Sequence, residues 1–444
     1  MTKIQLSDHF TFPKLLRFVL PSIAMLIMVS LYSIVDGFFI SNFVGKTSFA
    51  AINLIYPALM AVGTVGFMIG TGGCAVVSRT MGENDYERAN RYFSLFVYFS
   101  LFVGVILSVA GFLFMRPIAR ALGADGVLLQ DCVIYGRILF IAMPAFILQC
   151  SFPNFLVAAE KPNLNLAINI AAGLSNILLD YLLIVKCRWG LSGAAIATGI
   201  GQVIGGVIPL IYFLCKNNSK LRLTTPEMSG KILLTACGNG SSEMVSNLAA
   251  SVVSILYNFQ LMRLAGEDGV AAYGMIQYIN FIFTAIFMGF STGSAPIVSY
   301  HYGAKNEAEL QSLFRKSQVF LIISGIILCI VAQASAEPLV SVFVGKSAAL
   351  MKMTTQGVRL FSISFLIMGF NIWSSSFFTA LNDGKVSAII SFFRTFLFQV
   401  VIISVLPRIF DLTGVWLSAF FAEGLSLFVT VFLLIKNKKQ YRYV

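Results

Sequence analysis

The sequence predicts an all-α membrane protein with twelve transmembrane helices, arranged as two similar halves of six. Of its 444 residues, 58% are hydrophobic and only 11% are charged, and the mean hydropathy of +0.85 leaves too much apolar surface for a water-soluble domain. Apolar runs of about 20 residues or more, the length that spans a bilayer, recur along the whole chain. The second half of the chain also repeats the pattern of the first.

The apolar runs are separated by charged or turn-forming clusters, so each run is assigned to one span. Spans are predicted at residues 15–43, 49–78, 92–115, 132–158, 164–185, 192–215, 232–262, 270–298, 314–336, 354–380, 386–406 and 414–435. The polar stretch after the sixth span contains Pro226 and Gly230 and is the one strong candidate for a boundary. We therefore predict an N-terminal bundle at 1–217, a cytoplasmic linker at 218–230 and a C-terminal bundle at 231–444.

An internal duplication follows from sliding the chain against itself by 221 residues. TGGCAVVSRTMG (71–82) then falls on TGSAPIVSYHYG (292–303), with five of twelve positions identical, and isolated matches such as Gly136 with Gly357 keep the same offset. Six spans per half is an even number, so both halves enter the membrane from the same side. Parallel repeats of this kind are typical of transporters.

Basic residues set the expected orientation. With both termini cytoplasmic, the loops on that side carry more Lys and Arg than the outer loops, as the positive-inside rule requires. The net charge of +12 thus reports topology, and no nucleic-acid partner is expected. We predict a multi-pass protein of the cell (inner) membrane that works as a monomer, with the lipid bilayer as its surroundings.

The sequence contains no pattern that indicates an enzyme or a metal site. The seven Cys are scattered without a C-x-x-C pair and the chain has two His, both outside the predicted spans, so no disulfide framework, metal site or cofactor is expected. An intramembrane enzyme would need a nucleophile with a base, or metal ligands. We expect a protein that is not an enzyme.

Acidic residues inside spans are costly, by about 2.5 to 3.5 kcal/mol at a helix centre, and therefore informative. Counted from the basic residues at the outer helix ends, Asp36, Asp180 and Thr198 lie at similar depths below the outer surface, and Asn176 is one turn from Asp180. Two carboxyls, an amide and a hydroxyl at one depth can bind a small cation or share a proton. We predict an ion-coupling site here, the alternative being a buried polar cluster that holds helices together.

The second half lacks this set, because the 221-residue offset places Tyr257, Leu397, Val401 and Ala419 at the four positions. Its own intramembrane charges are Arg394 and Glu423, which lie at nearly matching depths. We expect them to form a buried ion pair. A structural role and a functional role explain such a pair equally well. Pro21 interrupts the first span and is a candidate hinge, although a fixed packing bend explains it equally well.

Several stretches together resemble the multidrug and toxic compound extrusion (MATE) family over essentially the whole chain. They are SIVDGFFISNFVG around Asp36, TGGCAVVSRTMGENDYERA at the end of the second span, NILLDYLLI around Asp180 and GLSGAAIAT at the start of the sixth. The resemblance implies a V-shaped pair of bundles around a central cavity. It also implies alternating-access export of cationic, often aromatic compounds in exchange for protons or sodium ions.

Within that family, the sequence is closer to the DinF-type branch, whose ion site lies in the N-terminal half. The resemblance assigns coupling-ion roles to Asp36, Asn176, Asp180 and Thr198, and a bending role to Pro21. Small-molecule drugs or organic cations are the expected partners, and the coupling ion, H⁺ or Na⁺, is left open. A lipid-linked oligosaccharide flippase of the same superfamily is the alternative, but it would need a cationic cavity, and Arg394 is the one basic residue deep in a span.

Overall fold

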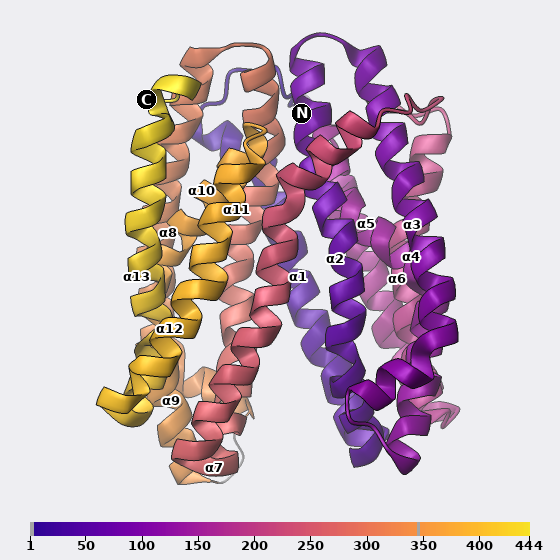
Figure 1. Cartoon of the computed structure of the whole chain (residues 1–444), viewed down its shortest axis with the longest axis vertical. Coiled ribbons are helices and arrows are strands. Elements are labelled where there is room, and N and C mark those ends of the chain that lie inside the picture. The colour runs from indigo at the N-terminus through magenta and orange to yellow at the C-terminus, as the bar shows by residue number, and fades with distance from the viewer. Residues whose placement is uncertain (1–3, 344–346) are drawn as a thin grey trace.

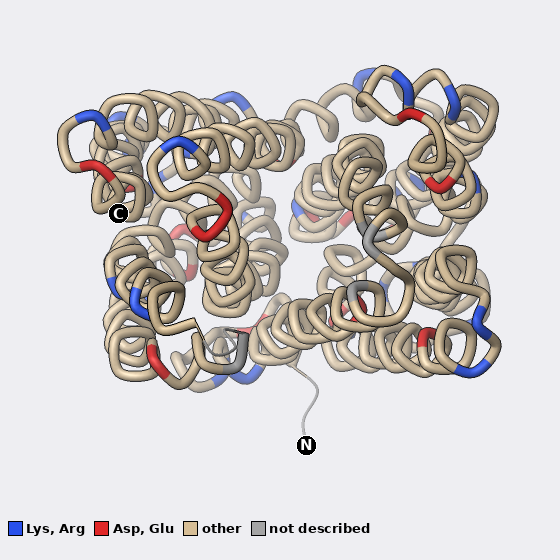
Figure 2. Tube along the Cα trace, turned by 90° about the horizontal axis from the view of Figure 1, so that it is seen from below, with Lys and Arg blue, Asp and Glu red and all other residues tan. Residues whose placement is uncertain are grey.

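A computed structural model describes residues 4–343 and 347–444, and those residues form helices and connecting loops without a strand. Figure 1 shows the helices running roughly along the long axis, in two groups that Figure 2 shows end-on. The N-terminal half contains α1 (Phe12–Phe43), α2 (Lys46–Gly82), α3 (Tyr86–Ala121), α4 (Gly126–Ala158), α5 (Pro162–Leu179), the π-helix η1 (Asp180–Lys186) and α6 (Gly190–Leu214). The C-terminal half contains α7 (Gly230–Gly303), α8 (Glu307–Phe343), α9 (Ala348–Ser362), α10 (Phe365–Ala380), α11 (Gly384–Phe392), the π-helix η2 (Phe393–Leu397), α12 (Phe398–Val405) and α13 (Pro407–Tyr441).

The number of spans among the described residues agrees with the prediction of twelve. Ten helices are long and apolar enough to cross a membrane, and α9 with α10, bent by 52°, makes an eleventh. The helix α7 has 74 residues and leaves the helical conformation at Gly266 (φ 61°, ψ −149°), where its direction reverses (Figure 1). It therefore counts as two spans.

Three local features were not predicted from the sequence. The tenth span is broken between α9 and α10, and the fifth and eleventh spans contain the π-helical turns η1 and η2. Several helices also run beyond the apolar stretch, because polar residues close their ends. At α3, for example, the Asp85 side chain accepts a hydrogen bond from the Arg88 backbone N–H, which extends the helix six residues ahead of the predicted Tyr92.

Residues with positive φ mark the same points in both halves, as the internal duplication predicts. These residues end or join helices, where a left-handed conformation turns the chain. Four pairs recur at offsets of 221 to 223 residues: Gly45 with Gly266, Asn84 with Lys305, Glu160 with Asn382, and Arg188 with Asp411. The two halves thus share their turns as well as their spans.

The two halves meet closely at the end of the bundle that carries both termini and the linker (Figure 1). A Cβ atom added to Gly82 of α2 would lie 2.0 Å from the Tyr300 carbonyl oxygen, and one added to Gly303 of α7 would lie 2.1 Å from the Arg79 carbonyl oxygen. Only glycine permits such close backbone contact between helices. The reciprocal pair, related by the 221-residue offset, closes this end of the protein.

Residues 4–11, called the N-terminal strap below, cross the closed end and contact both halves. The Leu6 backbone N–H donates to Glu160 Oε1 at 3.0 Å, after α4, and the Phe10 backbone N–H donates to Glu309 Oε1 at 2.9 Å, in α8. The Leu6 and Phe10 side chains are fully buried. The His9 ring nitrogen Nδ1 lies 2.6 Å from Glu309 Oε2. The strap therefore ties the halves together at this end.

The linker between α6 and α7 lies against α3 and contacts Glu160, the residue that also binds the N-terminal strap. The Arg222 backbone N–H donates to Asn90 Oδ1 at 2.7 Å, and the Thr224 backbone N–H donates to Ser94 Oγ at 2.8 Å. Lys220 Nζ lies 3.2 Å from Glu160 Oε1. The connection is non-helical, from Cys215 to Ser229, yet it has a fixed path along the N-terminal half.

Candidate ion-binding site

The structure brings Asp36, Asp180 and Asn176 together in the N-terminal half. Asp36 lies in α1, Asn176 in the last turn of α5, and Asp180 is the first residue of η1. The Asp36 carboxyl is within hydrogen-bonding reach of both the Asp180 carboxyl and the Asn176 amide. Asp180 is fully buried and Asn176 is 5% exposed. Two carboxyl groups therefore share one enclosed space, as the sequence predicted.

Most of these carboxyl oxygens lack a donor. Among the described residues, Asp36 Oδ1 and both Asp180 carboxyl oxygens are buried without a hydrogen-bond partner. A buried charge without a partner is strongly disfavoured, so such a pair requires a bound cation or proton. Its oxygen ligands suit a proton or a small hard cation, and the described residues contain no cluster of three or more His, Cys, Asp or Glu.

The π-helix η1 begins at the ion site. A π-helical turn widens the helix by one residue per hydrogen bond and shifts the side chains that follow, and such turns are frequent at functional sites. Here the transition from α5 to η1 falls on Asp180 itself. Asn176 and Asp180, four residues apart, lie on the same side of the helix and face Asp36.

Thr198 of α6 completes the predicted set, and Tyr135 of α4 adds a member that sequence reasoning missed. Thr198 Oγ1 has no hydrogen-bond partner in the described part of the chain. The Tyr135 hydroxyl is adjacent to it and near both Asp36 and Asp180, and Tyr135 is 3% exposed. A tyrosine on a largely apolar span carried no signal of its own in the sequence.

Further tyrosines surround the carboxyl pair on the side that faces the other half. Tyr32, one turn before Asp36, lies close to Asp36 and Tyr56. Tyr56 of α2 approaches Tyr278 of α7 from the C-terminal half, and a Cβ on Gly37 would lie 3.6 Å from the Tyr278 hydroxyl. Tyr56 and Tyr278 are 51% and 43% exposed. The site therefore borders accessible space between the halves.

Pro21 lies within α1, on the strap side of Asp36. The helix continues through it from Phe12 to Phe43 without a non-helical residue, in contrast to α7 and α13. Proline has no N–H to donate to the Arg17 carbonyl four residues earlier. This turn of α1 is therefore one hydrogen bond weaker than its neighbours, while its role as a hinge stays a prediction.

Arg394 and Glu423 of the C-terminal half form an ion pair. Arg394 Nε lies 2.9 Å from Glu423 Oε1 and 3.1 Å from Oε2, with side chains 16% and 2% exposed. The Asn371 side-chain amide donates to Glu423 Oε2 at 2.7 Å, and Glu243 of α7 also faces Arg394. Arg394 lies in η2, so both π-helices carry an intramembrane charge. This arginine is compensated by carboxylates.

Both halves of the chain resemble one known protein family. A model of the MatE family matches the chain twice, over residues 21–182 and 244–405, once in each half. The multidrug export protein MepA of Staphylococcus saprophyticus is 24% identical over 430 residues, which cover 95% of this chain and 94% of that protein. The MepA protein of Staphylococcus haemolyticus is 25% identical over 427 residues, covering 95% and 93%.

Solved structures show the same fold. The outward-facing conformation of a multidrug resistance MATE family transporter of the MOP superfamily superposes with a TM-score of 0.93 at 20% identity, covering 100% of this chain and 99% of that chain. A MOP superfamily transporter from Pyrococcus furiosus gives a TM-score of 0.89 at 20% identity, covering 100% and 98%. Since the family model matches most of the sequence and the fold agrees throughout, the chain belongs to the MatE family of multidrug and toxic compound extrusion transporters.

Proposed function

We propose that this protein exports cationic or amphiphilic organic compounds, drugs among them, in exchange for protons or sodium ions entering the cell. The observation that carries the proposal is the adjacent pair of carboxyls, Asp36 and Asp180, of which Asp36 Oδ1 and both Asp180 oxygens are buried without a hydrogen-bond partner among the described residues. Such a pair is stable only when a cation or proton is bound. The relatives named multidrug export proteins support the export of drugs.

Ion binding couples to drug release through charge neutralisation. An external proton or sodium ion that binds at Asp36 and Asp180 removes the electrostatic repulsion between them and changes how α1 packs against α5 and η1. Moving one positive charge inward across 100 mV supplies about 2.3 kcal/mol, which supports roughly a fifty-fold gradient of an uncharged drug per ion. Exchange of one ion for one monovalent cationic drug moves no net charge, so the concentration gradient of the ion then supplies the work. Asn176 and Thr198 serve either as sodium ligands or as hydrogen-bond partners of a protonated carboxyl.

The turn around Pro21 is the proposed bending point of α1. Its missing hydrogen bond lowers the cost of a local change in helix direction, and α1 carries Asp36 at one end and continues into the N-terminal strap at the other. A change at the ion site therefore reaches the contacts between the halves along a single helix. The bending role of Pro21 is the one that the resemblance to the DinF-type branch implies.

The tyrosines beside the ion site suit the proposed substrates. Aromatic faces attract organic cations by roughly 0.5 to 2 kcal/mol each, and Tyr56 and Tyr278 present exposed rings from opposite halves. A cationic drug bound between them would lie close to Asp36. Ion and drug would then compete for the same negative charge, which is the simplest form of exchange.

The protein is proposed to act in the cell membrane, as a monomer, with both termini and the linker cytoplasmic. The termini and linker lie at the same end of the bundle (Figure 1), as an even number of spans requires, and the positive-inside rule assigns that end to the cytoplasm. A flippase for a lipid-linked pyrophosphate would need an uncompensated cationic cavity. The pairing of Arg394 with Glu423 argues against that alternative.

Reconstituted proteoliposomes test the proposal. Efflux of a fluorescent organic cation is measured under an imposed proton gradient and, separately, under an imposed sodium gradient, for the wild type, Asp36→Asn and Asp180→Asn. We expect one gradient to drive export and each variant to lose that dependence. Asp268→Asn, which changes an exposed carboxyl in α7, is the matched control. Full ion-driven efflux by Asp36→Asn would overturn the coupling assignment.

A further inference from the structure

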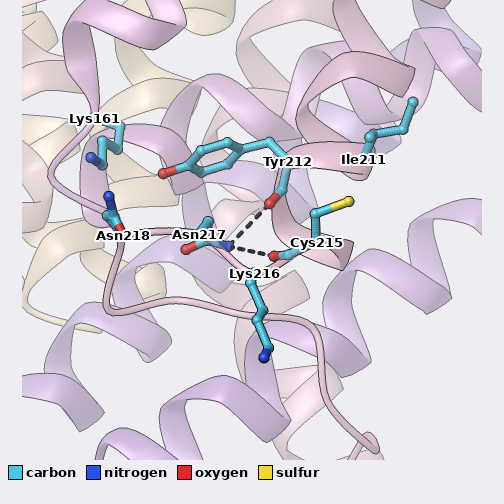
Figure 3. A pocket seen from close by; sticks show the side chains of 7 residues that line it. All are labelled: Lys161, Ile211, Tyr212, Cys215, Lys216, Asn217 and Asn218. Atoms are coloured by element: carbon cyan, nitrogen blue, oxygen red, sulfur yellow. Dashed lines mark hydrogen bonds between the residues drawn. The ribbon is translucent and has the colours of Figure 1, made fainter.

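A pocket of about 320 Å³ lies where the α4–α5 corner, the end of α6 and the start of the linker meet. Figure 3 shows the side chains that line it: Lys161, Ile211, Tyr212, Cys215, Lys216, Asn217 and Asn218. Its volume falls within the range of ligand sites. The pocket is separate from the proposed ion site, and neither the coupling mechanism nor the proposed drug path uses it.

The lining of this pocket is positively charged. It contains two lysines and no carboxylate, and neither Lys161 nor Lys216 forms an ion pair with any described residue. In Figure 3 the Lys161 ammonium, the Tyr212 hydroxyl and the Asn218 amide lie on the same side, whereas Lys216 extends on the other side of Asn217. The Tyr212 hydroxyl is buried and has no hydrogen-bond partner within the described ranges. A cation, an unpaired hydroxyl and an amide therefore lie on one side of the pocket.

The loop that shapes the pocket is held in place by Asn217. Its Nδ2 donates to the Tyr212 carbonyl at 3.0 Å and to the Cys215 carbonyl at 3.4 Å, which partly satisfies the carbonyl end of α6. Its Oδ1 accepts from the Ser219 backbone N–H at 2.9 Å and from Ser219 Oγ at 2.7 Å. Asn217 is thus committed to the loop, while Lys161, Tyr212 and Asn218 stay available.

The pocket lies beside the surface of α6 that faces outward from the bundle. Ile211 lines it and is 53% exposed, and Leu214 in the following turn is 58% exposed. In a membrane protein such exposed aliphatic side chains contact acyl chains. The polar part of the pocket therefore lies at headgroup level, at the end that carries the linker and both termini (Figure 1).

The corresponding corner of the C-terminal half is different. The positive-φ residues Glu160 and Asn382 are equivalent, so Lys161 corresponds to Asp383. Asp383 Oδ2 accepts a hydrogen bond from the Tyr441 hydroxyl at 2.7 Å, and Tyr443 is buried there, 1% exposed. The chain's own C-terminal residues fill this corner and satisfy its carboxylate. The corner at Lys161 therefore differs in its charge and its filling from the described counterpart at Asp383.

We propose that the pocket binds the phosphate group of an anionic phospholipid. Lys161 supplies the charge, the Tyr212 hydroxyl and the Asn218 amide donate hydrogen bonds to phosphate oxygens, and Lys216 adds to the local positive potential. The acyl chains lie along Ile211 and Leu214. Basic pockets at headgroup level recognise lipid phosphates in this way. The inference is independent of the proposed transport activity.

Native mass spectrometry of the detergent-purified full chain tests the proposal. Phosphatidylglycerol and phosphatidylcholine with the same acyl chains are titrated against the wild type, Lys161→Gln/Lys216→Gln and Tyr212→Phe. Lys438→Gln/Lys439→Gln is the control, because it removes the same charge from exposed lysines at the end of α13. In a parallel arm, the change in melting temperature with added inorganic phosphate is measured on the same four proteins.

We expect the pocket double variant to bind phosphatidylglycerol roughly 10- to 30-fold more weakly than the wild type, and Tyr212→Phe to bind it several-fold more weakly. The control variant should bind phosphatidylglycerol as tightly as the wild type does. Binding of phosphatidylcholine should be the same for all four proteins. Lysine-dependent stabilisation by inorganic phosphate, without a preference for phosphatidylglycerol, would overturn the lipid as the ligand and identify a free anion. Equal phosphatidylglycerol binding by the pocket and control variants would overturn the site altogether.

Discussion

Arg394 and Glu423 form a buried ion pair with Nε 2.9 Å from Oε1, across η2 and α13. Glu423→Ala leaves the arginine without its closest carboxylate in a site that water cannot enter freely. We expect the free energy of unfolding to fall by about 3 to 5 kcal/mol. The measurement is the thermal stability of the detergent-solubilised protein.

Glu337→Ala is the control for this prediction. It removes a carboxylate from the exposed pair with Arg359, whose side chains are 66% and 48% exposed, so a change of less than about 1 kcal/mol is expected. Equal destabilisation by the two variants would show that burial of the Arg394 pair has no special consequence.

The second prediction concerns coupling between Asp36 and Asp180. Because the two carboxyls share one space, they act as a unit, and removing either one should abolish most of the ion dependence of efflux. The double variant Asp36→Asn/Asp180→Asn should therefore lose little more than either single variant, which is a strongly non-additive cycle. Additive losses in proteoliposome efflux would mean that the two residues work at separate sites.

The third prediction isolates the Tyr135 hydroxyl. Tyr135→Phe keeps the ring packed in α4 but removes the group that lies beside Thr198 and near both carboxyls. We expect the ion concentration for half-maximal efflux to change several-fold, with the apparent affinity for the drug unchanged. Tyr98→Phe, at a position 40% exposed on α3, is the control and should behave as the wild type. A change in drug affinity alone would place Tyr135 in the drug site instead.

The fourth prediction concerns Pro21. Pro21→Ala restores the N–H that can bond to the Arg17 carbonyl and so stiffens α1. We expect unchanged or higher thermal stability together with slower transport, by about tenfold. Pro209→Ala, inside α6, is the matched control. A normal transport rate in Pro21→Ala would contradict the hinge and show that the proline serves only in packing.

The fifth prediction concerns the N-terminal strap. Glu309→Ala removes the acceptor of the Phe10 N–H and the partner of His9, so the strap should open more often. We expect amide hydrogen exchange in residues 4–11 to become about tenfold faster, which corresponds to the loss of about 1.4 kcal/mol. Glu307→Ala, which breaks only the exposed pair with Arg442, should leave that exchange unchanged.

Much of the candidate site could be predicted from the sequence, because charge inside a span is costly and therefore rare. Asp36 and Asp180 were identified in this way, and the matching depths of Arg394 and Glu423 anticipated their contact. Tyr135 could not be found, since a tyrosine in an apolar span carries no comparable cost. The basic pocket was also missed, because lysines in a loop are ordinary until a cavity brings Lys161 and Tyr212 together.

The sequence by itself determined the spans and the intramembrane charges, because each depends on the free energy of placing one residue type in lipid. It also determined the duplication, because matching residues recur at one constant offset. The tertiary structure decided which side chains meet. The π-helical turns at Asp180 and Arg394, the close approach of α2 and α7 at Gly82 and Gly303, and the path of the strap depend on packing between segments far apart in the chain. Such contacts leave no local pattern, since their energy belongs to pairs of residues and not to positions in the sequence.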